Sequence, residues 1–426
     1  MRLSFLFTLL FSVLICQAQE YIEHPKFPKG INSNDQYEAV PHYNEAVELY
    51  KKGEIERAKT SLLEAINTSF ALVEAQLFLG EIYYEQGRID SAMIYLNSGI
   101  DFEINQPAHY YFKLFEVGMK LELYDVLKHN LKHFKKYYGN IDYGEYDSLY
   151  PYTVNDYEFY MNSVSLATDY NYWKTRAVKV TDLQLSNKSE VIPTTKGLVI
   201  SSTEDQKLIK RKGLKKNRIK MKEFTFFQSE WISNELSFRT VNENGIYKSY
   251  WKFEKDDNWV LLPKEVNNGS WNGHFFYAPK YSLIYFSSDR TGNKDLFVIK
   301  FNSVNSSFSQ LSPLSRVNTK GDEIYPTFIN NVFYFSSNGL PGFGGFDIYF
   351  TPDYSIENGL ITPSKWYNLG KPYNTGDDEI QFMIYDDFQF VSSTNWNNQN
   401  KIVVFKPKVA HTDFDYEIKL KKIEKD

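Results

Sequence analysis

The sequence predicts an α + β multidomain protein, in which an N-terminal α-helical solenoid is followed by an all-β propeller of six blades. Positions 46, 80 and 114 lie 34 residues apart and carry the small or apolar side chains of a helical repeat. After residue 150, short strand-like segments recur six times, most of them with paired serines. Aromatic residues make up 17% of the 426 residues. Flat rings pack well on pleated strands, and a period of about 34 residues is typical of helix–turn–helix arrays.

The composition is that of a globular chain, with 42% hydrophobic and 24% charged residues. Disorder, collagen and a coiled coil are therefore excluded as the main architecture. The formal net charge is −5 at pH 7, so a general electrostatic attraction to nucleic acid is absent and no nucleic-acid partner is expected.

Residues 1–18 are expected to be a signal peptide. Arg2 gives a positive start, the run from Leu3 to Cys16 is almost wholly apolar, and cleavage is expected after Ala18. The alternative is lipidation at Cys16, against which Ile15 stands where a small residue should precede the cysteine. Cleavage after Ala18 removes the single cysteine, which excludes disulfide, zinc–thiolate and cysteine-nucleophile chemistry. No later stretch approaches 18 apolar residues, so no transmembrane span is expected.

Residues 19–36 are predicted to be a linker, and residues 37–140 a set of helical repeats. The segment around Gly80 has apolar or small residues at the positions where two antiparallel helices meet, including Leu79, Tyr83, Ala92 and Leu96. The unit before it matches well, and the third, around position 114, is degenerate. This region resembles the tetratricopeptide repeat family.

If the repeat register is right, the inner helices present an aromatic groove with an acidic centre, which suits a peptide or a partner helix. The predicted groove residues are Tyr43, Tyr50, Leu77, Glu81, Tyr84, Glu85, Tyr111 and Phe115. The alternative is that several of these aromatic residues pack between repeats.

Residues 150–420 are predicted to form the propeller. The six strand-like units are anchored at positions 168, 201, 239, 287, 336 and 392, and the first of them is a predicted strand at Val164–Thr168. Their spacing is close to the roughly 40–50 residues that a four-stranded blade needs. Val178–Leu183 is expected to supply the outer strand of the first unit. Tyr416–Leu420 is the segment available for the outer strand of the sixth.

The run Ser336-Ser337-Asn338-Gly339, with Gly342, Gly344, Gly345, Asp347, Ile348 and Tyr349 after it, resembles the TolB-like, WD-type propeller repeats of bacterial envelope proteins. The order of helical repeats and then propeller is similar to the periplasmic part of OmpA-type proteins of Bacteroidota, including those associated with type IX secretion. The usual C-terminal peptidoglycan-binding domain has no match, so direct peptidoglycan anchoring is not expected. The resemblance implies a periplasmic scaffold associated with the outer membrane, whose partners are envelope proteins such as an outer-membrane β-barrel.

The sequence carries no HExxH, GxSxG or GxxxxGK[ST] motif, so no enzyme, cofactor or metal site is expected. His129 and His133 lie four residues apart on a predicted helix, a spacing that could bind a metal, and they are interpreted as helix-surface histidines. Acidic residues recur at equivalent places in the β units and are expected to hold turns and strands together, because a catalytic residue is needed at one position only. These are Glu190, Glu323 and Glu379 at one place, and Asp295 and Asp347 at another. The glycine-rich run 342–345 is interpreted as a hairpin loop.

A basic run between Lys207 and Lys222 is the strongest local charge anomaly. It contains Lys207, Lys210, Arg211, Lys212, Lys215, Lys216, Arg218, Lys220 and Lys222. It is either a patch for an anionic surface or a solvated hairpin whose lysines guard a blade edge.

The alternative function is a hydrolase or a carbohydrate-binding propeller with acids in its central funnel. The candidate acids are Asp377, Asp378, Asp386 and Asp387.

Overall fold

The structure is a computed structural model, and contacts divide the chain into two units, residues 1–168 and 169–426, each considered by itself. It describes residues 21, 23, 33–102, 106–139, 154–168 and 177–407, the last range with gaps at 186–188, 195–196, 203–205, 210–229, 234, 254, 352–353, 358–359, 364–365, 386–387 and 396. Within these ranges, no helix has the length and apolar character needed to cross a membrane.

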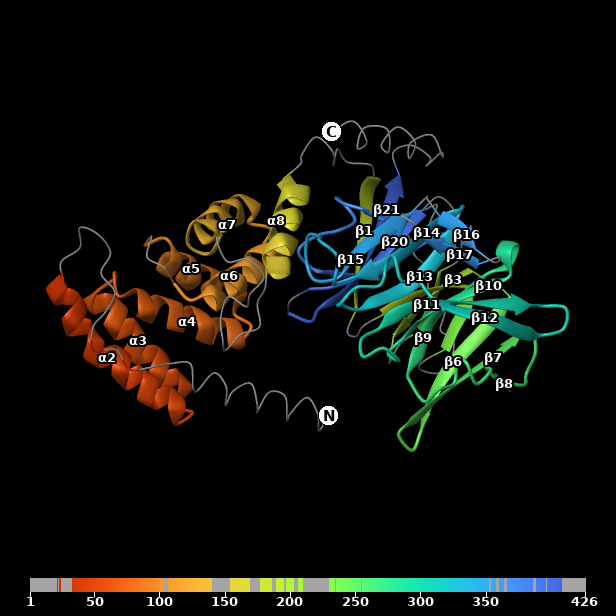
Figure 1. Cartoon of the computed structure of the whole chain (residues 1–426), viewed down its shortest axis with the longest axis horizontal. Helices are drawn as coiled ribbons and strands as arrows, with labels where there is room; N and C mark the ends of the chain where they lie inside the picture. The colour runs from red at the N-terminus through yellow and green to blue at the C-terminus, as the bar shows by residue number, and fades with distance from the viewer. Residues whose placement is uncertain are drawn as a thin grey trace. The chain divides into compact units, whose positions relative to one another are not determined.

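The first unit consists of paired helices (Figure 1). They are α2 (Ser33–Lys51), α3 (Ile55–Thr68), α4 (Val73–Glu85), α5 (Ile89–Ile100), α6 (Ala108–Lys120), α7 (Tyr124–Tyr138) and α8 (Val154–Thr168). The second helices of the three pairs begin at residues 55, 89 and 124. These starts are 34 and then 35 residues apart, which confirms the period read from the sequence.

Each turn inside a helix pair has a residue in the left-handed conformation. Gly53 has φ 78°, Gly87 has φ 68°, and Glu122 has φ 55° at the equivalent place in the third pair. The next amide donates to a carbonyl five residues back, as in Glu54 to Leu49, which closes a Schellman turn. Glycine adopts this conformation without steric cost and glutamate does not, so the third repeat departs from the pattern in its turn.

Small residues allow the helices of a pair to approach closely. A Cβ placed on Gly80 would lie 2.9 Å from the backbone nitrogen of Leu96, and one on Gly118 would lie 2.4 Å from a Leu127 methyl carbon. Ala46, at the predicted crossing position of the first pair, is fully buried. The small residues therefore serve the packing role that the repeat pattern predicted.

The predicted strand at Val164–Thr168 is wrong, because these residues belong to α8. Tyr157 and Tyr160 of α8 pack their rings against Phe134 of α7 and Phe115 of α6, with centroid distances of 5.2 and 5.4 Å. Buried Val164 continues this face at a helical spacing. The helical unit therefore extends to residue 168, and the β unit does not begin at 150.

The second unit is built from antiparallel sheets. Its strands are β1 (Ala177–Leu185), β2 (Ser189–Thr194), β3 (Gly197–Ser202), β4 (Gln206–Ile209), β5 (Glu230–Ser233), β6 (Leu236–Glu243), β7 (Ile246–Phe253), β8 (Val260–Leu261), β9 (Asn272–Ala278), β10 (Leu283–Ser288), β11 (Asp295–Asn302), β12 (Ser307–Pro313), β13 (Glu323–Ile329), β14 (Val332–Ser337), β15 (Asp347–Thr351), β16 (Tyr354–Glu357), β17 (Leu360–Pro363), β18 (Tyr367–Asn368), β19 (Asp378–Tyr385), β20 (Phe388–Thr394) and β21 (Asn400–Pro407). A 3₁₀ turn, η1 (Pro279–Tyr281), precedes β10.

These strands form five blade sheets among the described residues, and six blades were predicted. The sheets are β2-β3-β4, β5-β6-β7-β8, β9-β10-β11-β12, β13-β14-β15-β18 and β19-β20-β21-β1, with β16-β17 as a separate hairpin. The first strands contact one another in the order β2, β5, β9, β13, β19 and back to β2, so the ring is closed by five blades. The anchors at 201, 239, 287, 336 and 392 all lie on second strands, whereas the anchor at 168 lies on α8.

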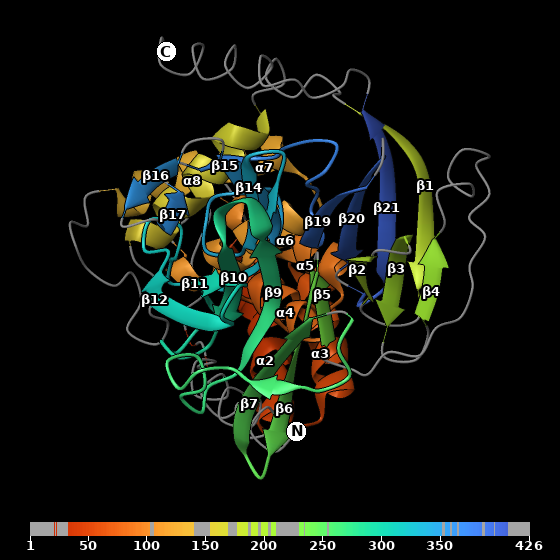
Figure 2. The same cartoon turned by 90° about the vertical axis from the view of Figure 1, so that its right-hand side faces the viewer.

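Strand β1 completes the last blade rather than the first. It pairs antiparallel with β21, with Asp182 opposite Val403 and Leu183 opposite Ile402 (Figure 2). Joining the two ends of the β unit in one sheet removes an open edge, which is a common solution for strands that close on themselves. The other predicted outer strand, Tyr416–Leu420, lies outside the described residues.

Apolar side chains fill the spaces between neighbouring blades. One cluster joins β10 and β11 to β14, with Tyr285, Leu296 and Phe333 all at 1% exposure or less. A second joins β14 and β15 to the last blade through Phe350 and Phe382. In the part of the chain that the structure describes, many aromatic side chains lie in these packed faces and in the helical core.

Candidate interaction surfaces

A row of polar side chains crosses the first helices of the three pairs. The Tyr50 hydroxyl on α2 donates to Glu85 of α4 at 2.8 Å, and the Tyr84 hydroxyl donates to Glu116 of α6 at 2.5 Å. Lys120 donates to Glu116 at 2.7 Å. These five residues are called the polar row below. Because α2, α4 and α6 are equivalent helices of successive repeats, residues at the same height on them meet in space.

A buried ion pair lies next to the polar row. Lys113 of α6 donates to Glu81 of α4, and both side chains are almost fully buried, at 7% and 1% exposure. The ammonium group of Lys113 is also 5.8 Å from the centre of the Tyr84 ring. Lys113 compensates part of the acidic centre predicted from the sequence. It was missed because its partner is 32 residues away and belongs to another repeat.

Glu85 is the predicted acidic residue that remains exposed on this face. Although the residue as a whole is exposed, its carboxyl group is partly desolvated by its surroundings, which raises its pKa to about 7, and the nearby Glu81 adds to this effect. The hydrogen bond from Tyr50 and the charge of Lys113 act in the opposite direction. Glu85 therefore changes charge near neutral pH, and it does so at a position that a partner can reach.

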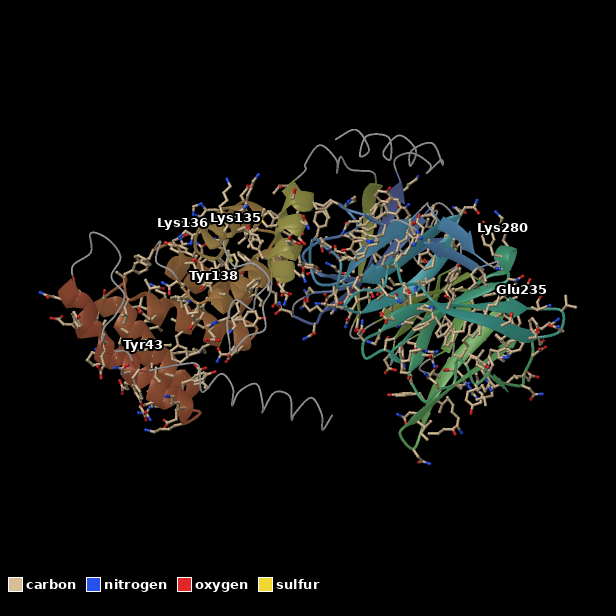
Figure 3. The ribbon with its side chains drawn as sticks, in the orientation of Figure 1. Tyr43, Lys135, Lys136, Tyr138, Glu235 and Lys280 are labelled. Carbon is tan, nitrogen blue, oxygen red and sulfur yellow. The ribbon has the colours of Figure 1, made fainter. Side chains whose placement is uncertain are left out.

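The other predicted groove residues form the helical core. Tyr43, Leu77, Tyr111 and Phe115 are at most 3% exposed, so the alternative of packing between helices describes them. Tyr43, labelled in Figure 3, packs its ring 6.1 Å from Phe78. The structure thus brings together Tyr50, Glu81, Tyr84 and Glu85 out of the eight, and adds Lys113 and Glu116.

In the propeller, the recurring glutamates hold blade junctions. Glu323, at the start of β13, accepts hydrogen bonds from the backbone and hydroxyl of Thr319 at 2.8 and 2.6 Å and from Ser337 at 2.7 Å. Glu379, at the start of β19, accepts from Thr375 and Ser393 in the same pattern. This confirms the interpretation that these acids hold turns and strands.

Burial shifts the ionisation of these acids. Glu323 is fully buried, which raises its pKa to about 7 although its hydrogen bonds favour the charged form. Burial also raises the pKa of Glu379 well above its usual range. Raised carboxyl pKa values are typical of catalytic acids, but here the same carboxylates recur in equivalent structural positions.

Asparagines, which the sequence reading missed, clamp the third strand of the preceding blade. Asn318 accepts from the Leu296 amide at 2.9 Å and donates to the Leu296 carbonyl at 3.0 Å. Asn374 does the same to Ile348, and Asn267 to Ser249. Each stands five residues before the equivalent polar residue at the start of the next inner strand. That spacing, Asn267 to Asn272, Asn318 to Glu323 and Asn374 to Glu379, is the signal that could have found them.

The glycine-rich loop before β15 surrounds a carboxylate of the chain itself. Asp347 is fully buried and accepts from the amides of Phe343 and Gly344 at 2.6 and 3.3 Å. A Cβ on Gly342 would lie 1.7 Å from the Asp347 carboxylate, so only glycine fits there. Burial raises the pKa of Asp347 to about 7. The loop therefore joins two strands, as predicted, and its amides are directed at Asp347.

The acids proposed for a funnel site are in part engaged in blade contacts. Asp378 accepts from the Phe346 amide at 3.0 Å, and Asp377 forms an ion pair with Lys401 at 2.7 Å. Asp386 and Asp387 lie outside the described residues. Of the basic run, Lys207 lies on β4, and the residues from Lys210 to Lys222 also lie outside the described part of the chain.

The comparisons with known proteins concern the β unit. The sequence matches no family model and no curated protein. Among solved structures, TolB from Acinetobacter baumannii matches with 13% identity and a TM-score of 0.28, over 53% of this chain and 55% of that one. A putative TolB from Agrobacterium tumefaciens matches with 13% identity and a TM-score of 0.31, over 50% and 72%.

A glycosyl hydrolase from Bacteroides ovatus also matches, with 8% identity and a TM-score of 0.30, over 55% of this chain and 87% of that one. This chain spans about half the length of TolB from Acinetobacter baumannii. The strand topology defines a closed antiparallel β-propeller, which follows a unit of paired helices along the chain. Likenesses of this strength carry no inference about activity or partners.

Proposed function

We propose that this protein is a non-enzymatic scaffold of the bacterial cell envelope, which holds one partner on its helical unit and another on its propeller. The observation that carries the proposal is Glu85, an exposed carboxylate fixed by Tyr50 on a face shared by successive helix pairs. Paired-helix arrays of this kind offer continuous surfaces for partner segments. The signal peptide expected at residues 1–18 supports a periplasmic location.

The chemistry of the helical face favours a partner segment with a cationic side chain. Glu81 is compensated by Lys113, and Glu116 by Lys120, so Glu85 in its ionised form contributes the negative charge of the row. A lysine or arginine of a partner would face this carboxylate while its alkyl stem packed on the Tyr84 ring. Outer-membrane and type IX secretion assemblies are the candidate sources of such a segment.

The propeller supports the scaffold role through the way its acids are used. Glu323, Glu379, Asp347 and Asp378 each accept hydrogen bonds from loops and strands of the blades. In this role, these carboxylates hold the ring of propeller blades together. The basic run from Lys207 to Lys222 is proposed as a second contact, with an anionic surface, and would be screened by salt.

The test is affinity capture from envelope membranes with the full mature chain and two variants. Glu85→Gln should reduce capture about two- to fivefold at low salt, the range expected for one exposed ion pair. Asp125→Asn removes another exposed carboxylate, on α7, and should leave capture unchanged. Tyr84→Ala should weaken capture at all salt concentrations, because it removes apolar contact. Equal capture by wild type, Glu85→Gln and Tyr84→Ala would exclude the helical face as the site that binds the partner.

A further inference from the structure

Three potential metal ligands meet on the outer part of the first helix pair. His42 and Glu45 lie one turn apart on α2, and Glu64 faces them from α3. His42 Nδ1 lies 3.3 Å from a carboxylate oxygen of Glu64. One ligand atom from each of the three residues lies within 4.8 Å of the other two. The hydrogen bonds given above for the polar row do not involve these three residues.

The distance between His42 and Glu64 fits the edge length of a tetrahedral metal site. With metal–ligand bonds of about 2.0–2.1 Å, two ligands of a tetrahedral zinc ion lie roughly 3.3–3.4 Å apart. The separation of His42 Nδ1 and Glu64 has this value, and a carboxylate oxygen of Glu45 lies within 4.8 Å of both. One imidazole and two carboxylates form a ligand set that zinc accepts, with water in the fourth position.

The Glu45 carboxylate has a partner that orients it. Ser61 of α3 lies 3.3 Å from Glu45 Oε2 and donates its hydroxyl hydrogen to it. Contacts of this kind hold ligating carboxylates in place in metal sites. The His42 and Glu64 side chains are 40% and 55% exposed, so an ion and a water molecule have access from solvent.

We propose that His42, Glu45 and Glu64 bind a divalent transition-metal ion, with zinc as the best match, and that the ion links α2 to α3. Since its ligands come from both helices of the first pair, the ion stabilises that pair when bound. This site was not predicted from the sequence, where His129 and His133 were the histidines with metal-like spacing. In the structure His133 is directed to the Tyr111 hydroxyl at 2.9 Å, and His129 is exposed.

The experiment is titration of the metal-free full mature chain with Zn²⁺ in a calorimeter, followed by Co²⁺ spectroscopy. One equivalent of Zn²⁺ should bind, and Co²⁺ should give the intense visible absorption of a tetrahedral ion. His42→Ala and Glu64→Gln should each weaken zinc binding by at least about tenfold. His129→Ala, which removes an exposed histidine elsewhere on the helical unit, should bind zinc like wild type.

Thermal unfolding provides a readout that does not depend on the calorimeter. Zinc should raise the unfolding temperature of wild type and of His129→Ala, and at the same zinc concentration should raise that of Glu64→Gln clearly less. Glu64→Gln keeps the size and hydrogen-bonding capacity of the side chain, so a folded variant is expected by circular dichroism. Absence of zinc binding in wild type, or equal affinity in His42→Ala and wild type, would overturn the proposal.

Discussion

Glu323 and Glu85 are glutamates whose pKa lies near 7, and burial of the carboxyl group is the main cause in both. Their surroundings differ. Glu323 is enclosed by Thr319 and Ser337, whereas Glu85 has a hydrogen bond from Tyr50 and otherwise faces an accessible surface. The same shift therefore has a consequence for folding in one case and for binding in the other.

The buried propeller acids predict a pH dependence of stability. Glu323, Asp347 and Glu379 have raised pKa values in the folded state, so between about pH 4.5 and 7 the folded chain holds protons that the unfolded chain has released. The stability of the propeller should therefore fall as pH rises through 7. The unfolding free energy obtained from urea denaturation should be at least about 1 kcal/mol larger at pH 5.5 than at pH 8.

Glu323→Gln provides the control for this dependence. Glutamine keeps an acceptor for Thr319 and Ser337 and cannot ionise, so the decline with pH should become shallower. A midpoint that rises with pH in wild type would mean that the hydrogen bonds to these carboxylates outweigh their burial.

Sequence reasoning reached part of this residue-scale picture. Glu323 and Glu379 could be assigned to structural roles because they recur, and their hydrogen bonds confirm it. Lys113 could not be paired with Glu81, because a cross-repeat contact depends on the exact stacking of helices. Likewise, the cluster of His42, Glu45 and Glu64 exists only once α3 folds back on α2.

At the scale of elements, the two units rely on local devices that repeat. Each helix pair has a turn residue in the left-handed conformation. In the blades, an asparagine side chain forms hydrogen bonds with the backbone of the third strand, as a neighbouring strand would. The turn glycines were visible in the sequence at the repeat period. The strand prediction at Val164–Thr168 failed because a short alternation of apolar and polar residues also fits a helical face that includes Tyr157, Tyr160 and Val164.

Gly87→Ala tests the turn device. Its Cβ would meet no atom within 4 Å, so the cost comes from the backbone alone, whose φ is 68°. The helical unit should lose about 1 kcal/mol of unfolding free energy, measured by urea denaturation. Gly87→Asn should lose less, since asparagine tolerates the left-handed region. No loss with alanine would show that the turn can adopt another conformation.

Asn318→Ala tests the blade clamp. The substitution leaves the amide and the carbonyl of buried Leu296 without their side-chain partner, which should cost about 1–3 kcal/mol. Asn305→Ala, in the exposed turn between β11 and β12, should cost about 0.5 kcal/mol or less. Hydrogen exchange of the Leu296 amide should accelerate in the first variant. Unchanged exchange there would contradict the clamp.

At the scale of the whole molecule, the β unit closes by joining strands that are over 200 positions apart in the sequence. The six-blade prediction counted α8 as a blade and gave β1 to the wrong sheet. A sequence of six similar segments cannot show which ends meet, because closure depends on how much each blade turns the ring. The pairing of β1 with β21 and the contact of β19 with β2 resolve the count.

A disulfide between registered positions tests the closure. Asp182 of β1 is opposite Val403 of β21, so Asp182→Cys with Val403→Cys should form a disulfide and raise the urea midpoint. The background carries Cys16→Ser, which removes the native cysteine. The control pair is Asp182→Cys on β1 with Ser201→Cys on β3. These two strands belong to different sheets, so the two cysteines should stay reduced. Oxidation of the second pair alone would contradict the assignment of β1.

The most direct test of the scaffold role is photo-crosslinking in living cells from a single position on the helical unit. A photoreactive amino acid in place of Glu85 should yield a covalent adduct with an envelope protein. The same amino acid in place of Ile94, which is 62% exposed on α5, should yield none. Adding Lys113→Gln should reduce the adduct from position 85, since it removes the ammonium group that forms a buried ion pair with Glu81 next to this face. Equal adducts from positions 85 and 94, or none from position 85 in a folded and exported chain, would contradict a partner on this face.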